Sequence, residues 1–317
     1  MDRRSFLATG ATIALLPFTE APSFAAATAS GDAKLNALFE EIFEERIRTS
    51  PGFATALGLD KGKNARLRST FDPKPFQQAR AEDVARNRKA LAAVRAISPS
   101  TLSPPAALNR EIVIYDLERN LLAPTRFDLD SVQSPYLISQ QDGNYFGIPD
   151  FLNSQHPIET APDAEAYLSR LSEFGKLLDY ETAEQKRMAA RGFLAPGWSL
   201  DLALGQMAKL RAPAPAESGM VKSVADRAAK KGIAGDWAAR ATRIVERDVY
   251  PALDRQIAAI RALRPTTRAG DGAGRLQNGA EIYAAALEQA TTTTMSPEEV
   301  HQLGLSQVAE YTGLLDN

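Results

Sequence analysis

The feature that most constrains the fold is the spacing of apolar residues, which recur every three or four positions over most of the chain. From Leu35 onward this spacing predicts a helix that ends before Pro51, because the residue before a proline disfavours the helical conformation. The clearest helix begins near Ala161 and ends at Gly192. Its apolar face consists of Ala164, Tyr167, Leu168, Leu171, Phe174 and Leu178. Long alternating β-branched runs are missing, so the sequence predicts an all-α fold, a multi-helix array of long antiparallel helices.

The same spacing predicts further helices over 76–97, 106–122, 200–210, 236–264 and 281–289. In the second of these, the apolar stripe that could face the core consists of Leu108, Ile112, Tyr115 and Leu122.

Two local signals refine these boundaries. Pro251 lies inside the segment 236–264, so we expect a bend or a break near Asp248. Ser296 precedes a proline and stands three residues before Glu299, which is the pattern of a capping box at a helix start. A last helix is therefore predicted to begin there.

One long segment interrupts the helical pattern. Residues 124–162 contain five prolines and two glycines, and roughly forty residues without a helical period exceed an ordinary connection. Two interpretations stay open: a functional surface, or a structural strap packed across helices. Tyr145 and His156 lie in this segment and are weak candidates for a cleft. Core packing is the simpler expectation for Tyr145, and a hydrogen-bonded loop position is the simpler one for His156.

The reactive side chains are few. The chain has no cysteine and only two histidines, His156 and His301, which excludes zinc–thiolate sites and the helical zinc motif with two histidines four positions apart. A formal net charge of −2 gives no general attraction for nucleic acid, which we do not expect as a partner. His301 and Glu299 in the last predicted helix are further weak cleft candidates, although a surface histidine and a capping glutamate explain them equally simply. The residues alone therefore nominate no catalytic group, metal ligand or cofactor site.

The first 29 residues predict export. Arg3 and Arg4, followed by Phe6 and Leu7, match the twin-arginine signal pattern. The apolar stretch after them has about eleven residues, whereas a bilayer span needs roughly 20, and small residues that suit signal cleavage follow it. We therefore expect a signal peptide over 1–29, the export machinery of the twin-arginine route as a partner, a periplasmic or otherwise exported protein, and no stable membrane span after processing. An N-terminal helix of the domain that happens to start with two arginines is the alternative.

Three segments together resemble a known family. They are DFLNSQHPI with DAEAYLSRL over 150–171, YPAL over 250–253, and TTTTMSPEEVHQLGL over 291–305. The last is similar to the TT-x-x-TPEEIH-x-LG signature of the DUF885 family of mostly bacterial, often exported proteins. This resemblance extends from about residue 33 to 308. It implies a helical fold similar to helical zinc metallopeptidases, whose active site is a cleft between two helical halves.

The resemblance also implies a zinc-binding H-E-x-x-x-G-H-type segment after the signature, and this sequence contains none. No zinc ligand or general base can be carried over, so zinc is expected only in a full-length relative. We therefore expect residues 30–317 to be the N-terminal part of an exported DUF885-like zinc metallopeptidase, truncated before the metal-binding segment or encoded as half of a split protein. Such a chain would be inactive alone and would act on peptides only together with a C-terminal half. The alternatives are a non-enzymatic periplasmic helical binding or scaffold protein, and a non-functional fragment with exposed apolar surface.

Overall fold

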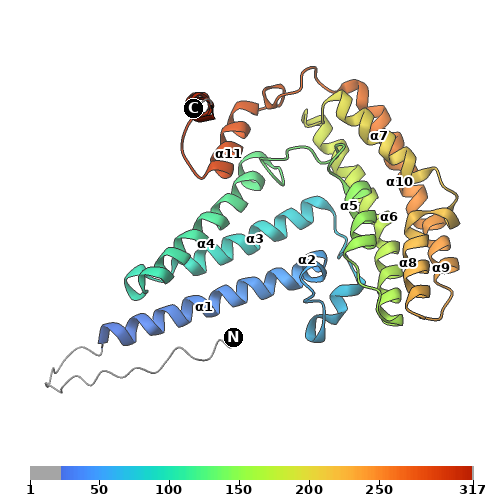
Figure 1. Cartoon of the computed structure of the whole chain (residues 1–317), viewed down its shortest axis with the longest axis horizontal. Helices are drawn as coiled ribbons and strands as arrows, with labels where there is room; N and C mark the ends of the chain where they lie inside the picture. The colour runs from blue at the N-terminus through green and yellow to red at the C-terminus, as the bar shows by residue number, and fades with distance from the viewer. Residues whose placement is uncertain (1–22, 316–317) are drawn as a thin grey trace.

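The computed structural model describes residues 23–315, and every regular element within this range is helical (Figure 1). The predicted all-α class is therefore confirmed. None of these described helices is both long and apolar enough to cross a membrane. The α-helices are α1 (Ser23–Thr49), α2 (Pro51–Ala56), α3 (Phe76–Arg95), α4 (Pro104–Leu122), α5 (Asn144–Ser154), α6 (Ala161–Ala190), α7 (Gly197–Arg211), α8 (Gly219–Lys230), α9 (Trp237–Ile244), α10 (Tyr250–Leu263), α11 (Gly279–Thr291) and α12 (Pro297–Leu315).

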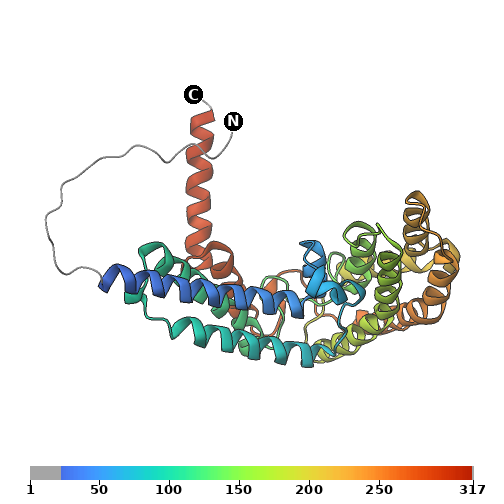
Figure 2. The same ribbon diagram turned by 90° about the horizontal axis from the view of Figure 1, so that it is seen from below.

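Helices α1, α3 and α4 lie side by side and form an N-terminal layer (Figures 1 and 2). Their shared apolar cluster includes Leu35 of α1 and Val94 of α3, both fully buried, and Leu117 of α4. As predicted, α1 ends just before Pro51, which begins α2. The 3₁₀ helix η1 (Gly62–Ser69) follows and packs against α6, so it links the layer to the rest of the molecule.

Helices α5 to α10 form a second, larger bundle around α6 (Figure 1). All six apolar residues predicted for the inner face of this helix are buried. The backbone of α6 also approaches a neighbour closely, because a Cβ on Gly175 would lie 2.4 Å from the carbonyl oxygen of Asp248. Glycine is therefore required at this contact.

Near Asp248, where a bend or a break was predicted, the helical run continues but changes to a π-helical turn. Helix α9 ends at Ile244, a π-helical turn spans Val245–Val249, and α10 begins at Tyr250 with Pro251 in its first turn. Proline lacks a backbone N–H, so it is tolerated where a helix starts and not where the hydrogen-bond ladder is continuous.

Three helices differ from the sequence-based prediction. The segment 124–162 is not irregular throughout, because α5 occupies 144–154 within it, with Pro149 inside the helix. Two glycines and this proline obscured its period, although Tyr145, Ile148 and Leu152 of α5 are buried. Helices α2 and α8 were not predicted at all.

The stripe proposed for 106–122 is wrong. Leu108 and Ile112 of α4 are 61% and 55% exposed, and the buried face carries Ala106, Arg110, Ile114 and Leu117 instead. Arg110 can lie there because its guanidinium donates hydrogen bonds to the carbonyl oxygens of Ile97 at 2.8 Å and Arg95 at 3.1 Å. A buried arginine on the inner face breaks the apolar pattern from which that face would be recognised.

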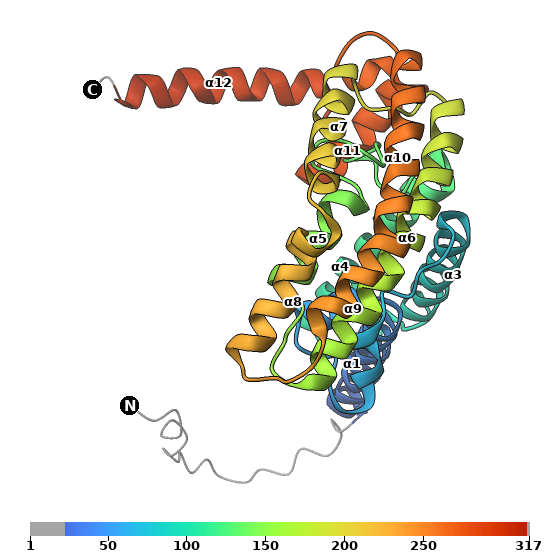
Figure 3. The same ribbon diagram turned by 90° about the vertical axis from the view of Figure 1, so that its right-hand side faces the viewer.

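The last two helices, α11 and α12, differ in how they contact the rest of the described chain. Residues 124–143, which precede α5, are called the strap below. Helix α11 buries Ile282 and Ala285 against this strap. Helix α12 projects away from every other element, which the two rotated views show clearly (Figures 2 and 3). Its predicted capping box is confirmed: the N–H of Ser296 donates to the Glu299 carboxylate at 2.7 Å, and the N–H of Glu299 donates to the Ser296 hydroxyl at 3.2 Å.

Candidate functional site

The residues proposed from the sequence as cleft candidates do not come together. Tyr145 is buried in α5, where its hydroxyl contacts the carbonyl of Ser139 at 2.6 Å. His301 is exposed on α12, and Glu299 caps the same helix. The fourth candidate, His156, is fully buried in the loop after α5. The proposed export residues Arg3, Arg4, Phe6 and Leu7 lie outside the described residues.

His156 is a structural residue, as the simpler sequence interpretation expected. Arg170 donates to its Nδ1 at 3.1 Å, so its Nε2 carries the proton and donates to the Asp163 carbonyl at 2.9 Å. Burial lowers the pKa of His156 to about 4; the Asp163 carbonyl opposes this shift, and the charges of Arg170 and Arg227 add to it. Both ring nitrogens are therefore engaged in a neutral imidazole.

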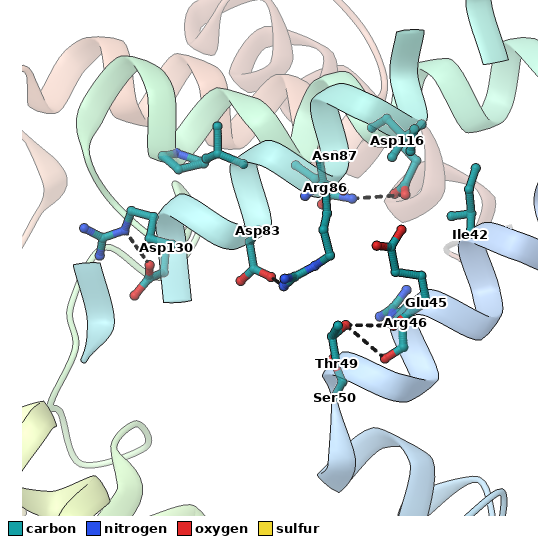
Figure 4. A pocket seen from close by; sticks show the side chains of 16 residues that line it. Ile42, Glu45, Arg46, Thr49, Ser50, Asp83, Arg86, Asn87, Asp116 and Asp130 are labelled. Atoms are coloured by element: carbon teal, nitrogen blue, oxygen red, sulfur yellow. Dashed lines mark hydrogen bonds and ion pairs between the residues drawn. The ribbon is translucent and has the colours of Figure 1, made fainter. Parts of the chain in front are cut away.

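A polar hollow of about 410 Å³ opens between α1, α3 and α4 (Figure 4). The side chains of Glu45 on α1 and Asp116 on α4 point toward each other, and the Arg86 side chain of α3 extends toward Asp83 (Figure 4). Its lining residues are Ile42, Glu45, Arg46, Thr49, Ser50, Arg80, Asp83, Val84, Arg86, Asn87, Ala90, Asp116, Leu117, Asn120, Pro124 and Asp130.

The charges in this first hollow are only partly paired. Arg86 pairs with Asp83, and Asp116 accepts a hydrogen bond from Asn120 at 3.1 Å. Within the described residues no ion pair involves Glu45 or Asp116. Arg46 also lines the hollow without an ion pair, so the unpaired side chains are two carboxylates and one cation. Their net negative charge favours a positively charged ligand group.

The floor of the hollow is an ion cluster centred on Arg80. Its guanidinium contacts three carboxylates, those of Asp130 at 2.8 Å, Asp128 at 2.7 Å and Glu184 at 3.2 Å. Arg187 also pairs with Asp128 at 2.6 Å and with Glu184 at 2.7 Å. This cluster fixes α3, α6 and the start of the strap to one another.

Glu184 is held as an anion within this cluster. Burial alone would raise its pKa, but hydrogen bonds from Arg187 and Gln77 and the charges of Arg187 and Arg80 lower the pKa to about 2. A carboxylate held so firmly by cations stays charged at neutral pH.

Two further hollows adjoin the first. Arg80 and Asp130 line both the first hollow and a second one of about 190 Å³ beside the strap. Pro135 and Tyr136 line both the second hollow and a third one of about 450 Å³ against α11. The third hollow is mainly apolar, and Ile282, Tyr283, Ala286 and Leu287 supply its α11 side. Shared lining residues therefore place the three hollows next to one another in a row.

The strap contributes to every hollow in this row, from Pro124 in the first to Asp142 in the second and Val132 in the third. The segment also buries Leu129, Val132 and Ile138, so both interpretations that the sequence left open, a functional surface and a structural strap, stay predictions. Nothing in the local sequence marked Arg80, Asp130 or Glu184, because residues 50 to 104 positions apart form this cluster only in the folded chain.

The described residues do not fit a zinc ion. They contain no group of three or more histidine, aspartate or glutamate side chains arranged to hold a metal. His156 uses both ring nitrogens elsewhere, and His301 lies on the outlying α12. No step of a reaction can therefore be routed through a metal bound by these residues.

Comparison with known proteins gives a family and a fold. The family model described as "Bacterial protein of unknown function (DUF885)" matches residues 51–317. A crystal structure described as "the putative lipoprotein from Colwellia psychrerythraea" superimposes with a TM-score of 0.77 at 21% sequence identity. This chain is covered over 90% of its length but spans only 50% of that solved chain. No curated protein matches the sequence.

Proposed function

This chain belongs to the DUF885 family, and from that premise we propose that it is the peptide-holding helical part of an exported, peptidase-type protein. The observation that supports the proposal is the row of three adjoining hollows along the strap, polar at the α1–α3–α4 end and apolar at the α11 end. An extended peptide fits such a row, since its side chains alternate in direction and meet different environments along it.

The polar end selects the kind of peptide. Glu45 and Asp116 present carboxylates that lack cationic partners within the described residues, so this end favours an amino terminus or a lysine or arginine side chain. The apolar end, around Tyr136 and Tyr283, favours an aliphatic or aromatic side chain. The proposed ligand is therefore a peptide with a basic group at one end and an apolar residue further along.

Hydrolysis of that peptide would require groups that these residues do not supply. The family resemblance suggests a zinc peptidase, yet the described residues contain no metal-holding group. We assign to this chain the binding and orientation of the peptide, and we assign bond cleavage to a second half. A binding protein without any catalytic half is the second candidate, and the same row of hollows supports it.

Peptide binding can be tested on the purified chain by fluorescence anisotropy with two labelled peptide pools that differ only in lysine or glutamate at one position. We expect tighter binding of the lysine pool, and loss of that preference in the double variant Glu45→Gln, Asp116→Asn. Glu111→Gln on the outer face of α4 serves as the control, because Glu111 lies outside the hollows. Equal binding of both pools to the wild-type chain would contradict the proposal.

The metal content of the same sample tests the assignment of peptide binding to this chain and of cleavage to a second half. We expect no stoichiometric zinc by elemental analysis and no cleavage of an unlabelled mixed peptide library. One tightly held zinc per chain, or cleavage that a chelator abolishes, would overturn the assignment of catalysis to a second half.

Export is a separate part of the proposal. Its support is the twin-arginine pattern at Arg3 and Arg4 and the description of the Colwellia psychrerythraea protein as a lipoprotein. Residues 1–29 fused to a fluorescent reporter should carry the reporter to the bacterial periplasm, and Arg3→Lys with Arg4→Lys should block this transfer. Periplasmic signal that persists in the double variant would exclude the twin-arginine route.

A further inference from the structure

Among the described residues that line the third hollow, Asp271 is the only charged one. The indole N–H of Trp198 donates to one carboxylate oxygen of Asp271 at 2.9 Å. Within the described residues, no hydrogen bond or ion pair involves the other carboxylate oxygen of Asp271. The mainly apolar hollow therefore carries one anionic acceptor with an unused oxygen.

The loop that carries Asp271 is fixed at its base. The guanidinium of Arg275 donates to the carbonyl oxygen of Leu194 at 2.7 Å and to that of Arg268 at 2.8 Å. These hydrogen bonds join the two ends of the segment 268–275 to each other and to the residues that precede α7. Asp271 lies between those ends, so its position beside the hollow is set by the loop as well as by Trp198.

The cations near Asp271 restrict the ligand that can reach it. Within the described chain Arg268 and Arg275 form no ion pair, and both donate to carbonyl oxygens. The Arg275 guanidinium lies 6.0 Å from the ring of Tyr136, which lines the hollow. A cationic ligand group beside Asp271 would be repelled by these two charges, whereas a neutral donor would not. The free carboxylate oxygen therefore favours a neutral hydrogen-bond donor.

The walls of the hollow favour an aromatic ring. Ile282, Ala286 and Leu287 of α11 supply apolar side chains, and the hollow has a volume of about 450 Å³. The ring of Tyr283, which is 51% exposed, is accessible for edge-to-face or offset packing. Asp271 is exposed at the rim, so the matching ligand is a ring with a donor at its tip.

We propose that the third hollow binds a tyrosine side chain of the peptide, with its ring against α11 and its hydroxyl donating to the free carboxylate oxygen of Asp271. Asp271 is then the residue that distinguishes tyrosine from phenylalanine. This inference rests on the proposed function, and it narrows the aliphatic or aromatic side chain assigned to that end of the row to a phenol.

Fluorescence anisotropy with the full chain tests the hydrogen bond. Three labelled peptide pools share a lysine at one position and differ at a second position, which is tyrosine, phenylalanine or lysine. We expect the tyrosine pool to bind about fivefold more tightly than the phenylalanine pool, because the phenol gains a charge-assisted hydrogen bond. The pool with the second lysine should bind more weakly than the tyrosine pool.

One variant and one matched control make the result specific. Asp271→Ala should reduce the affinity for the tyrosine pool to that for the phenylalanine pool and leave the latter affinity unchanged, which also shows that the variant is folded. Asp236→Ala removes an exposed carboxylate just before α9, outside the three hollows, and should keep the preference for tyrosine.

Nuclear magnetic resonance of the wild-type chain gives a second measurement. The chain has two tryptophans, and the buried Trp237 donates its indole N–H to the carbonyl of Ile233 at 3.1 Å. N-acetyl-tyrosine amide should shift the indole signal of Trp198, because the carboxylate that accepts from it gains a second donor, and should leave the signal of Trp237 in place. N-acetyl-phenylalanine amide should cause a smaller shift.

Three outcomes would overturn the inference. They are equal binding of the tyrosine and phenylalanine pools, a preference for tyrosine that survives Asp271→Ala, and tighter binding of the pool with the second lysine, which would make the ligand group a cation. The proposed function is judged separately, because its preference for lysine over glutamate depends on Glu45 and Asp116 at the other end of the row. Loss of that preference with the tyrosine preference intact would contradict the proposed function alone.

Discussion

Arg170 is a buried cation that contacts no carboxylate directly. It is fully buried, and its guanidinium donates to the carbonyl oxygens of Leu67 at 2.9 Å and Thr70 at 3.1 Å and to the Thr55 hydroxyl at 2.7 Å. The rings of Phe71 and Phe151 lie 5.0 and 5.1 Å from it. Arg170 thus holds the segment that joins the N-terminal layer to α6.

Burying the charged guanidinium of Arg170 is unfavourable, and nearby carboxylates help to keep it protonated. Burial lowers the pKa of Arg170 to about 10; the charges of Asp60 and Glu173 oppose this shift, and that of Arg68 adds to it. Removing the guanidinium would take away one donor each from the carbonyl oxygens of Leu67 and Thr70 and from the Thr55 hydroxyl. A buried polar group that is left without a partner costs about 1–3 kcal/mol.

We therefore predict that Arg170→Met lowers the free energy of unfolding by about 3 kcal/mol or more, measured by urea denaturation. Arg243→Ala on the exposed face of α9 is the matched control and should change it by less than about 0.5 kcal/mol. A loss below about 1 kcal/mol in the Met variant would show that water or a local rearrangement satisfies those carbonyl oxygens.

Glu181 is the buried carboxyl whose ionisation should be visible in the stability of the protein. Its oxygens accept hydrogen bonds from the N–H of Asn144 and from the side chain of Gln256, both at 2.8 Å. Burial raises the pKa of Glu181 to about 8, although these two hydrogen bonds act in the opposite direction. The folded chain therefore keeps this proton to a higher pH than the unfolded chain does.

The sign of the pH effect follows from this difference. Between the ordinary glutamate pKa of 4.5 and about 8, the folded state binds more protons than the unfolded state, so the free energy of unfolding falls as the pH rises. The fall can reach about 1.4 kcal/mol per pH unit. We predict that Glu181→Gln flattens this slope between pH 5 and 8 in urea denaturation, while Glu310→Gln on α12 keeps it. Parallel slopes for the wild type and Glu181→Gln would refute the assignment.

At the scale of elements, the close contact between α6 and the π-helical turn gives a sharp prediction. A Cβ on Gly175 would meet the Asp248 carbonyl at 2.4 Å, whereas one on Gly205 in α7 would meet nothing within 4 Å. Gly175→Ala should lower the free energy of unfolding by about 1–3 kcal/mol, because backbone must shift. Gly205→Ala should raise it by about 0.5–1 kcal/mol, because alanine is the better helix former. Thermal melts of both variants should shift in opposite directions, and equal shifts would contradict the contact.

The helices also show which elements the sequence could predict. The inner face of α6 follows from spacing alone because every one of its predicted apolar residues is buried. The inner face of α4 does not, because it contains Arg110, whose buried state depends on carbonyl oxygens of the preceding turn. Helix α5 was missed because Pro149 and two glycines are read as loop signals, whereas tertiary packing of Leu152 and its neighbours outweighs local propensity.

The candidate site was predictable only in outline. The length and composition of the segment 124–162 left a functional surface and a structural strap open, and residues of that segment line all three hollows. The ionic cluster around Arg80 could not be predicted, because its carboxylates come from α6 and from the strap, 48 to 104 positions away. The spacing of residues along the sequence predicts contacts within one helix, whereas the ion pairs of Arg80 join different elements.

At the scale of the whole molecule, α11 and α12 differ in whether they bury side chains against the rest of the described chain. Helix α11 buries Ile282 and Ala285 in a cluster with Phe127 and Met188, so its removal would expose apolar surface and leave a cavity. Helix α12 has no buried residue, so the stability of the rest of the chain should not depend on it.

We therefore predict that deleting residues 297–317 leaves the melting temperature within about 2 °C of the full chain, since a helix without buried contacts adds little to the free energy of unfolding. The same deletion should reduce self-association in sedimentation velocity, because it removes the exposed apolar residues from Leu303 to Leu315. Deleting residues 277–317 is the matched comparison, and it should lower the melting temperature by several degrees or more, because burying a residue such as Ile282 contributes about 1.5–3 kcal/mol. If the shorter deletion destabilised the chain as much as the longer one, α12 would have to pack on its own chain in solution.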